Sequence, residues 1–115
     1  MGQNFMSDII RKENLERKRA EIVNLAKKII KKNIDIIEGC IEIKWLWLDA
    51  ELPENDSYNF FTLISSDTDT FPKGYLREIS SEEYLKEQDK KEKEYLKKFE
   101  KDIEEECQKL IEKYG

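Results

Sequence analysis

The chain has 115 residues, of which 38% are hydrophobic and 41% are charged, and it has a net charge of −5 at pH 7. This length allows one domain with a slim core, and the charged composition, with only four glycines and two prolines, is typical of long amphipathic helices rather than sheets. No apolar run is long enough to cross a bilayer, and the N-terminus lacks the basic and apolar regions of a secretory signal, so we expect a cytoplasmic protein without a membrane contact.

The charge is unevenly distributed along the chain. Residues 1–33 carry nine basic and four acidic side chains, residues 34–80 carry three and ten, and residues 81–115 carry nine and twelve. An acidic middle does not suit nucleic acid or an anionic membrane, whereas it suits a basic protein partner. The alternative is that these are the solvated faces of an ordinary acidic protein. Residues 11–19, which are nearly all polar, form either a solvated helix end or a basic contact surface.

The first predicted element is a helix over residues 8–32, preceded by a disordered segment over residues 1–6. Ser7 is placed to cap this helix, and the charge of Asp8 favours the positive end of the helix dipole. Asn33 would end the helix, because asparagine tolerates the left-handed backbone conformation. The apolar stripe of this helix consists of Leu15, Ile22, Val23, Ala26, Ile29 and Ile30.

The segment over residues 34–52 is the most apolar part of the chain, and helical spacing gives it two neighbouring apolar stripes. One stripe contains Ile34, Ile37, Ile41, Trp45, Leu48 and Leu52, and the other contains Ile36, Cys40, Ile43 and Trp47. A helix with two apolar faces packs between partners, so we expect it between two long helices. The alternative is a β-hairpin over residues 34–48 that turns at Gly39, because isoleucine and tryptophan favour strands and a glycine inside a helix costs about 1 kcal/mol. The helical spacing continues along the whole segment and favours the helix.

Trp45 and Trp47 point to different sides of this predicted helix. One of them is expected in the core. The other either packs under residues 58–64 or lies exposed as an anchor for a partner, a role for which tryptophan is enriched at protein interfaces.

Pro53 ends the central helix, since proline disfavours helical backbone in the residue before it. Residues 58–64 are mostly aromatic and aliphatic, and we interpret them as an extended segment that packs over the helices as a lid. Residues 65–74 are rich in serine, aspartate, threonine, proline and glycine, and they predict an ordered loop.

A last helix is predicted from Ser80 or Ser81 to Tyr114, and Ser80 with Glu83 matches a capping box. Residues 86–94 are all polar and are expected to project beyond the core. The apolar stripe of this helix consists of Tyr95, Phe99, Ile103, Cys107, Leu110 or Ile111, and Tyr114.

These elements together predict a single all-α domain over residues 1–115. We expect an antiparallel bundle of three or four helices, with a long ordered loop between the second and the third. In this bundle the two long, charged helices enclose the shorter and more apolar one.

The sequence lacks most of the residues that common catalytic and metal sites require. The absence of histidine excludes Ser–His–Asp and Cys–His catalysis and histidine-based zinc sites. Cys40 and Cys107 are interpreted as small apolar core residues rather than as a disulfide. A calcium loop beginning at Asp67 would need an oxygen ligand and a glycine where Phe71 and Pro72 stand. We therefore expect a protein that is not an enzyme and that holds no metal and no cofactor.

Two segments resemble known bacterial proteins. Residues 21–43 resemble the start of the colicin D-like immunity proteins, through Leu25-Ala26-Lys27, Lys32 to Ile34, and Ile37-Glu38. This resemblance covers about a fifth of the chain, and it implies a small antiparallel helical bundle that binds and blocks a nuclease toxin. The remainder of the chain, including residues 60–80 (FFTLISSDTDTFPKGYLREIS), is similar to a family of small uncharacterised bacterial proteins, which have a Ser/Asp-Thr-Asp…Pro-x-Gly loop after two helices and a long last helix with a late cysteine. This second resemblance implies helices but no activity.

The residues and the first resemblance together predict a non-enzymatic, cytoplasmic protein-binding module. Its most concrete form is an immunity-type inhibitor, in which an acidic surface covers the active site of a basic toxin domain. The alternative is a homodimeric structural or regulatory helical protein. The candidate partner-binding residues are Glu38, Glu42, Trp47, Asp49, Glu51, Glu54, Asp56, Asp67 and Asp69.

Overall fold

The computed structural model describes the backbone of residues 2–115 and the side chains of residues 8–115. The chain forms five helices rather than the three or four that the sequence predicts: α1 (Gly2–Ile30), α2 (Ile36–Asp49), α3 (Asp56–Asp67), α4 (Tyr75–Ile79) and α5 (Glu82–Tyr114). No strand occurs over residues 2–115, so the all-α prediction is confirmed and the hairpin alternative for residues 34–48 is wrong.

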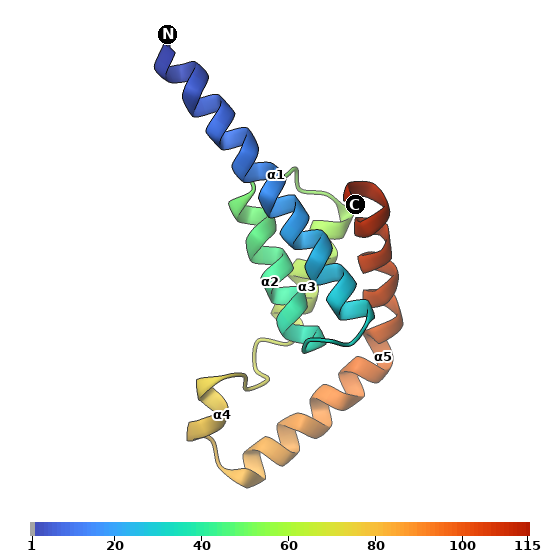
Figure 1. Ribbon diagram of the computed structural model, residues 1–115. Coiled ribbons are helices and arrows are strands. Elements are labelled where there is room, and N and C mark those ends of the chain that lie inside the picture. The colour runs from blue at the N-terminus through green and yellow to red at the C-terminus, as the bar shows by residue number, and fades with distance from the viewer. Residues whose placement is uncertain (1) are drawn as a thin grey trace.

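Four of these helices, α1, α2, α3 and α5, pack as a bundle, and each runs opposite to the one before it (Figure 1). Helix α1 packs against both α2 and α5, α2 packs against α3, and α3 makes a smaller contact with α5. This differs from the expected arrangement, because the two long helices contact each other directly and α2 lies between α1 and α3. The second apolar face of α2 thus packs against α3, a helix that the sequence did not predict.

The core takes side chains from all four helices of the bundle. Its fully buried apolar residues include Ile22, Ala26, Ile29, Ile37, Cys40, Ile43, Trp47, Phe61, Ile64, Ile103, Cys107 and Leu110. The predicted stripes of the first and last helices are therefore confirmed. Cys40 and Cys107 are free thiols, as expected. Burial raises the pKa of the Cys107 thiol to about 12 and raises the pKa of the Cys40 thiol as well, so both remain protonated core residues.

The ends of α1 differ from their predicted positions. The helix begins at Gly2, so residues 2–6 are helical rather than disordered and Ser7 does not start the helix; Met1 lies outside the described residues. At the other end the left-handed residue is Lys32, with φ 59°, and not Asn33. The Asn33 N–H donates to the Lys28 carbonyl at 2.9 Å, and the Lys32 N–H donates to a carbonyl one turn earlier. This pair of bonds is the Schellman ending of a helix.

Residues 58–64 belong to helix α3 and do not form the predicted extended lid. The Asn55 side chain caps α3 by accepting a hydrogen bond from the Tyr58 N–H at 3.0 Å, and Asp56 lies in the first turn, where a negative charge is favoured. The helix buries Phe61 and Ile64 against the bundle. The long connection between the second and the last predicted helices is therefore largely helical.

The molecule is elongated because two segments project from opposite ends of the bundle (Figure 1). Its extents are 61 × 31 × 23 Å, and its radius of gyration is 16.7 Å, against about 13 Å for a compact domain of this length. One projecting segment is the N-terminal half of α1. The other, which we call the arm, comprises residues 71–95, that is α4 and the start of α5, and it contains the polar residues 86–94 that were expected to project.

The arm is held together by polar contacts along its inner side. The Arg77 guanidinium donates to both carboxylate oxygens of Asp89, at 2.8 and 2.9 Å. Lys73 forms an ion pair with Asp35 at 2.9 Å and another with Glu92. These contacts position α4, which makes little contact with the other helices.

The start of α5 also differs in detail from the predicted one. Ser81 is the N-cap, and its Oγ accepts a hydrogen bond from the Tyr84 N–H at 3.2 Å. Ser80, which the capping-box pattern favoured, instead donates from its hydroxyl to the Leu76 carbonyl at 2.5 Å. Ser80 therefore closes α4, and its neighbour opens α5.

Candidate protein-binding surface

One face of α2 carries an aromatic side chain among three acids. Glu38, Glu42, Trp45 and Asp49 follow one another at steps of four, three and four residues, which places them on one side of a helix. All four side chains are exposed, and Trp45 is 55% exposed. We call these four residues the α2 surface.

The two tryptophans of α2 have opposite environments. Trp47 is 1% exposed, its indole N–H donates to the Pro53 carbonyl at 3.1 Å, and its ring contacts the rings of Tyr58 and Tyr114. A partner cannot contact Trp47 there, so the prediction of Trp47 as a binding residue is wrong and Trp45 is the exposed tryptophan. The reason is α3, which covers the Trp47 side of α2 with Tyr58.

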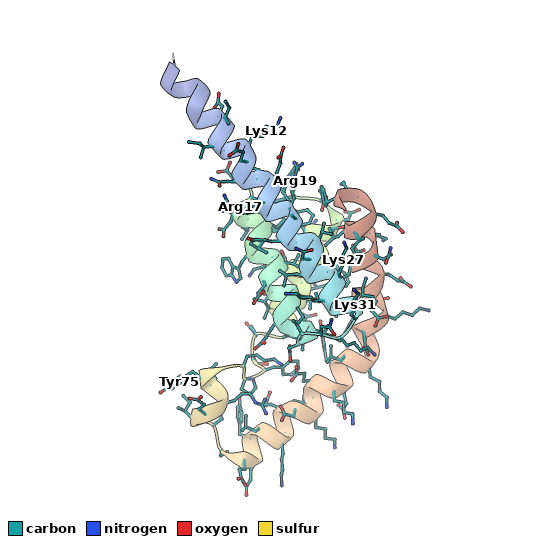
Figure 2. The ribbon with its side chains drawn as sticks, viewed as in Figure 1. Lys12, Arg17, Arg19, Lys27, Lys31 and Tyr75 are labelled. Atoms are coloured by element: carbon teal, nitrogen blue, oxygen red, sulfur yellow. The ribbon has the colours of Figure 1, made fainter. Side chains whose placement is uncertain are left out.

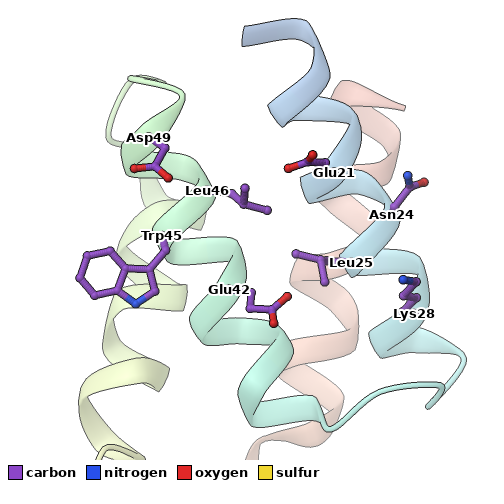
Figure 3. A pocket seen from close by; sticks show the side chains of 8 residues that line it. All are labelled: Glu21, Asn24, Leu25, Lys28, Glu42, Trp45, Leu46 and Asp49. Atoms are coloured by element: carbon purple, nitrogen blue, oxygen red, sulfur yellow. The ribbon is translucent and has the colours of Figure 1, made fainter. Parts of the chain in front are cut away.

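Trp45 stands at the edge of a groove of about 460 Å³ between α1 and α2 (Figure 3). The groove is lined by Glu21, Asn24, Leu25, Lys28, Glu42, Trp45, Leu46 and Asp49. In Figure 3 the side chains of Leu25 and Leu46 lie between the two helices, whereas the Trp45 indole points away from α1. The Lys44 ammonium lies 4.2 Å from the centre of the Trp45 ring and contacts it as a cation on an aromatic face.

The chemistry of this groove suits a cationic side chain. Glu21 reaches into it from α1 and Glu42 from α2, while Leu25 and Leu46 supply an apolar floor. An arginine or lysine of a partner has an aliphatic stem that such a floor can contact and a charged head that carboxylates can bind.

The other predicted acids do not join the α2 surface as one patch. Glu51 forms an ion pair with Arg11 of α1. Glu54 and Asp56 are exposed in the turn after α2 and at the start of α3. The remaining two, Asp67 and Asp69, lie at the opposite end of α3.

Asp67 has a structural partner, since its carboxylate accepts a hydrogen bond from the Tyr95 hydroxyl at 3.2 Å. Burial and the neighbouring charge of Asp67 raise the pKa of the Tyr95 phenol above its ordinary value. Of the nine predicted residues, the structure therefore brings only Glu38, Glu42 and Asp49 to one helix face.

Sequence reasoning missed a second exposed surface, on the arm. Tyr75, Leu76 and Ile79 of α4 are all exposed, together with Tyr84 of α5. Their spacing after Gly74 is that of one helical turn with an apolar side, which is a weak signal in so short a segment.

Two general findings concern the described part of the chain. Among the side chains of residues 8–115, no group of three or more potential ligands is placed to hold a metal ion. None of the described helices combines the length and the apolar character that a membrane span requires.

Comparisons of the chain with protein-family models, with curated proteins and with solved structures find no match.

Proposed function

We propose that the chain is a non-enzymatic protein-binding module whose α2 surface contacts a basic protein partner. The observation that carries this proposal is the exposed indole of Trp45 among three carboxylates on one helix face. Large aromatic side chains near the centre of an interface supply much of its binding free energy, and the polar groups around them exclude water. The α2 surface has this composition.

The acids of the α2 surface favour a basic partner. Among the described side chains, none forms an ion pair with Glu38, Glu42 or Asp49. Their charge therefore remains available to attract a positively charged surface, and such steering accelerates association by about 10-fold to 1000-fold at low salt. The groove beside Trp45 then offers a binding place for one arginine or lysine of that partner.

In its most concrete form this module is an immunity-type inhibitor. A nuclease toxin binds the phosphate backbone of nucleic acid, so its active site is basic. A chain that covers such a site with the α2 surface blocks entry of the substrate and performs no chemistry itself. The absence of histidine from the sequence agrees with such a role.

The direct test is to measure the dissociation constant between the chain and the toxin domain encoded next to it, by titration calorimetry at low salt. We expect a micromolar or tighter complex. Trp45→Ala is expected to weaken it by about 30-fold or more, because truncation of a central aromatic costs about 2 kcal/mol or more. Leu63→Ala is the matched control, since Leu63 of α3 is 57% exposed but lies outside the α2 surface; its effect should stay below about threefold.

Two results would count against this function. Failure to bind any toxin domain encoded nearby, at micromolar concentration, would remove the immunity form. Binding that Trp45→Ala leaves unchanged would show that the partner contacts another surface.

A further inference from the structure

The tip of the arm exposes an apolar surface that no described part of the chain covers. Tyr75 is 70% exposed, and Leu76, Ile79 and Tyr84 are exposed around it. Figure 2 shows Tyr75 on the outer side of α4, away from α5. Ion pairs hold the inner side of the arm to α5, so this exposed apolar surface lies on a well-positioned helix. We call these four residues the arm tip.

A hollow of matching chemistry lies towards the opposite end of the molecule. Helix α1 and the end of α2 enclose about 330 Å³ there. Ile10, which is 54% exposed, and Leu15 supply apolar walls, and Asn14 and Lys18 supply hydrogen-bond donors at the edge. The remaining lining residues are Asp49 and the ion pair of Arg11 with Glu51. Such a hollow suits a tyrosine, whose ring is apolar and whose hydroxyl needs a polar partner.

The helical segments that carry the hollow and the arm tip differ in charge. Residues 8–19 have five basic and three acidic side chains, whereas residues 75–84 have three acidic and one basic. That one base is already bound to a carboxylate within the arm. The three acids, Glu78, Glu82 and Glu83, are exposed beside the arm tip. The arm tip is therefore an apolar surface with an acidic edge, whereas the outer half of α1 exposes Ile9 and Ile10 among charged side chains with an excess of bases.

We propose that a second copy of this chain occupies the arm tip, with Tyr75 of one copy in the hollow beside α1 of the other. One molecule cannot join its own two regions, because they lie towards opposite ends of a particle 61 Å long. In the pair, the exposed bases Lys12 and Arg17 meet the acids beside the arm tip, which gives the contact its electrostatic complementarity. A two-fold antiparallel pair makes this contact twice and leaves neither end uncovered. The contact does not use Trp45, although Asp49 of the α2 surface also lines the hollow.

Sedimentation equilibrium of the full chain at low salt tests this pairing. We expect a reversible monomer–dimer equilibrium in the micromolar range. Tyr75→Ser and Ile10→Asp each change an exposed side chain, so circular dichroism should show unchanged helix content in both variants. Each substitution is expected to weaken self-association by about tenfold or more, because it removes one side of the contact.

Mixing the two variants distinguishes this contact from any other. Each variant pairs weakly with itself, yet each retains the half of the contact that the other lacks. An equimolar mixture should therefore form a mixed dimer, through Tyr75 of the Ile10→Asp variant and the intact hollow of the Tyr75→Ser variant. Leu63→Ser is a similar change at an exposed residue of α3, and the Leu63→Ser protein should associate like the unmodified chain.

The pairing is overturned by any of three results. The first is a chain that stays monomeric up to about 100 μM, a concentration at which a specific interface of ordinary size is formed. The second is self-association that survives both substitutions, which places the interface elsewhere. The third is a mixture of the two variants that associates no better than either variant alone.

Discussion

At the scale of single residues, Gly39 decides how closely α1 and α2 approach. The residue is buried, and a Cβ atom at this position would lie 2.7 Å from Cγ1 of Ile29 and 2.9 Å from Cδ1 of Ile34. This glycine was the strongest sequence argument against a helix here. Its cost in helix propensity, about 1 kcal/mol, is offset by the close helix packing that only glycine permits.

Gly39→Ala is expected to lower the free energy of unfolding by about 1 kcal/mol. Crowding against Ile29 lowers the free energy of unfolding by about 1–3 kcal/mol, whereas the better helix propensity of alanine raises it by only about 1 kcal/mol. Urea unfolding measures the change. The same substitution in an Ile29→Ala background, where the Ile29 atoms are absent and only Cδ1 of Ile34 remains close, should cost less. A Gly39→Ala protein more stable than the original would refute this close approach of the two helices.

Asp35 joins the start of α2 to the arm. Its Oδ1 accepts a hydrogen bond from the Glu38 N–H at 2.9 Å, and its Oδ2 pairs with the Lys73 ammonium at 2.9 Å. Partial burial opposes ionisation of Asp35, but these hydrogen bonds prevail and hold its pKa below the ordinary value of 3.8. Because the pKa is lower in the folded state, Asp35 stabilises the fold above the ordinary value, and this stabilisation is lost as the pH falls through the folded pKa.

Two substitutions separate the cap from the charge of Asp35. Asp35→Ala loses both and is expected to lower the free energy of unfolding by about 1–2 kcal/mol at neutral pH, whereas Asp35→Asn keeps a capping oxygen and should cost less than about 1 kcal/mol. Urea unfolding should be measured at several pH values in the acid range. The difference in unfolding free energy between the Asp35→Asn protein and the unmodified chain should disappear below pH 3.8. If this difference in unfolding free energy does not change with pH, a role for the carboxylate charge is contradicted.

At the scale of elements, the sequence predicted the helices that have long stripes and missed those that do not. The stripes of α1 and α5 repeat over many turns, so their buried residues could be identified. Helix α3 buries Phe61 and Ile64 at helical spacing, but the next buried positions are Ser65 and Thr68. Because these buried positions are polar, the sequence shows no continuous apolar stripe for α3. A short aromatic run also does not distinguish a strand from a helix. The cap at Asn55 was the signal that could have revealed α3.

The candidate site was predicted only in part, for the same reason. The sequence placed Trp45 and Trp47 on different sides of α2 but could not say which side would be covered. That choice depends on α3, which supplies Tyr58 to the Trp47 side. The arm tip escaped prediction because its position depends on side-chain ion pairs between distant residues, such as Arg77 and Asp89, and no periodic pattern reports these.

Phe71 packs at the base of the arm, where the arm meets the bundle. Phe71 packs edge to face on Tyr95, with ring centres 6.1 Å apart, and Tyr95 packs in turn on Phe99. Phe71→Ala is therefore expected to let the arm open locally while the bundle stays folded. Limited trypsin digestion should then cut at Lys73 or Arg77 several-fold faster than in the unmodified chain.

Tyr75→Ala is the matched control for this experiment, because Tyr75 belongs to the same arm but is exposed. Digestion of the Tyr75→Ala protein should proceed at the original rate, measured at a dilution where the chain is monomeric. Equal cutting of the Phe71→Ala and Tyr75→Ala proteins would show that the aromatic contact does not hold the arm.

At the scale of the whole molecule, the fold is a small bundle that exposes apolar side chains on the outer half of α1, on the α2 surface and on the arm tip, as well as Leu48 of α2 and Leu63 of α3. The α2 surface is acidic and suits a basic partner, whereas the outer half of α1 and the arm tip complement each other. We propose on this basis that a different protein binds the middle of the molecule and that self-association uses its ends.

The central claim, that a basic partner binds over Trp45, can be tested with the two indole N–H signals in a ¹H–¹⁵N correlation spectrum. The Trp47 N–H is buried and bound to the Pro53 carbonyl, whereas Trp45 is exposed, so the two signals report on different places. On titration with a basic nuclease toxin domain that binds the chain, the Trp45 signal should shift or broaden in step with binding while the Trp47 signal stays nearly unchanged. A partner that binds and leaves the Trp45 signal unmoved would contradict the α2 surface as the site of contact.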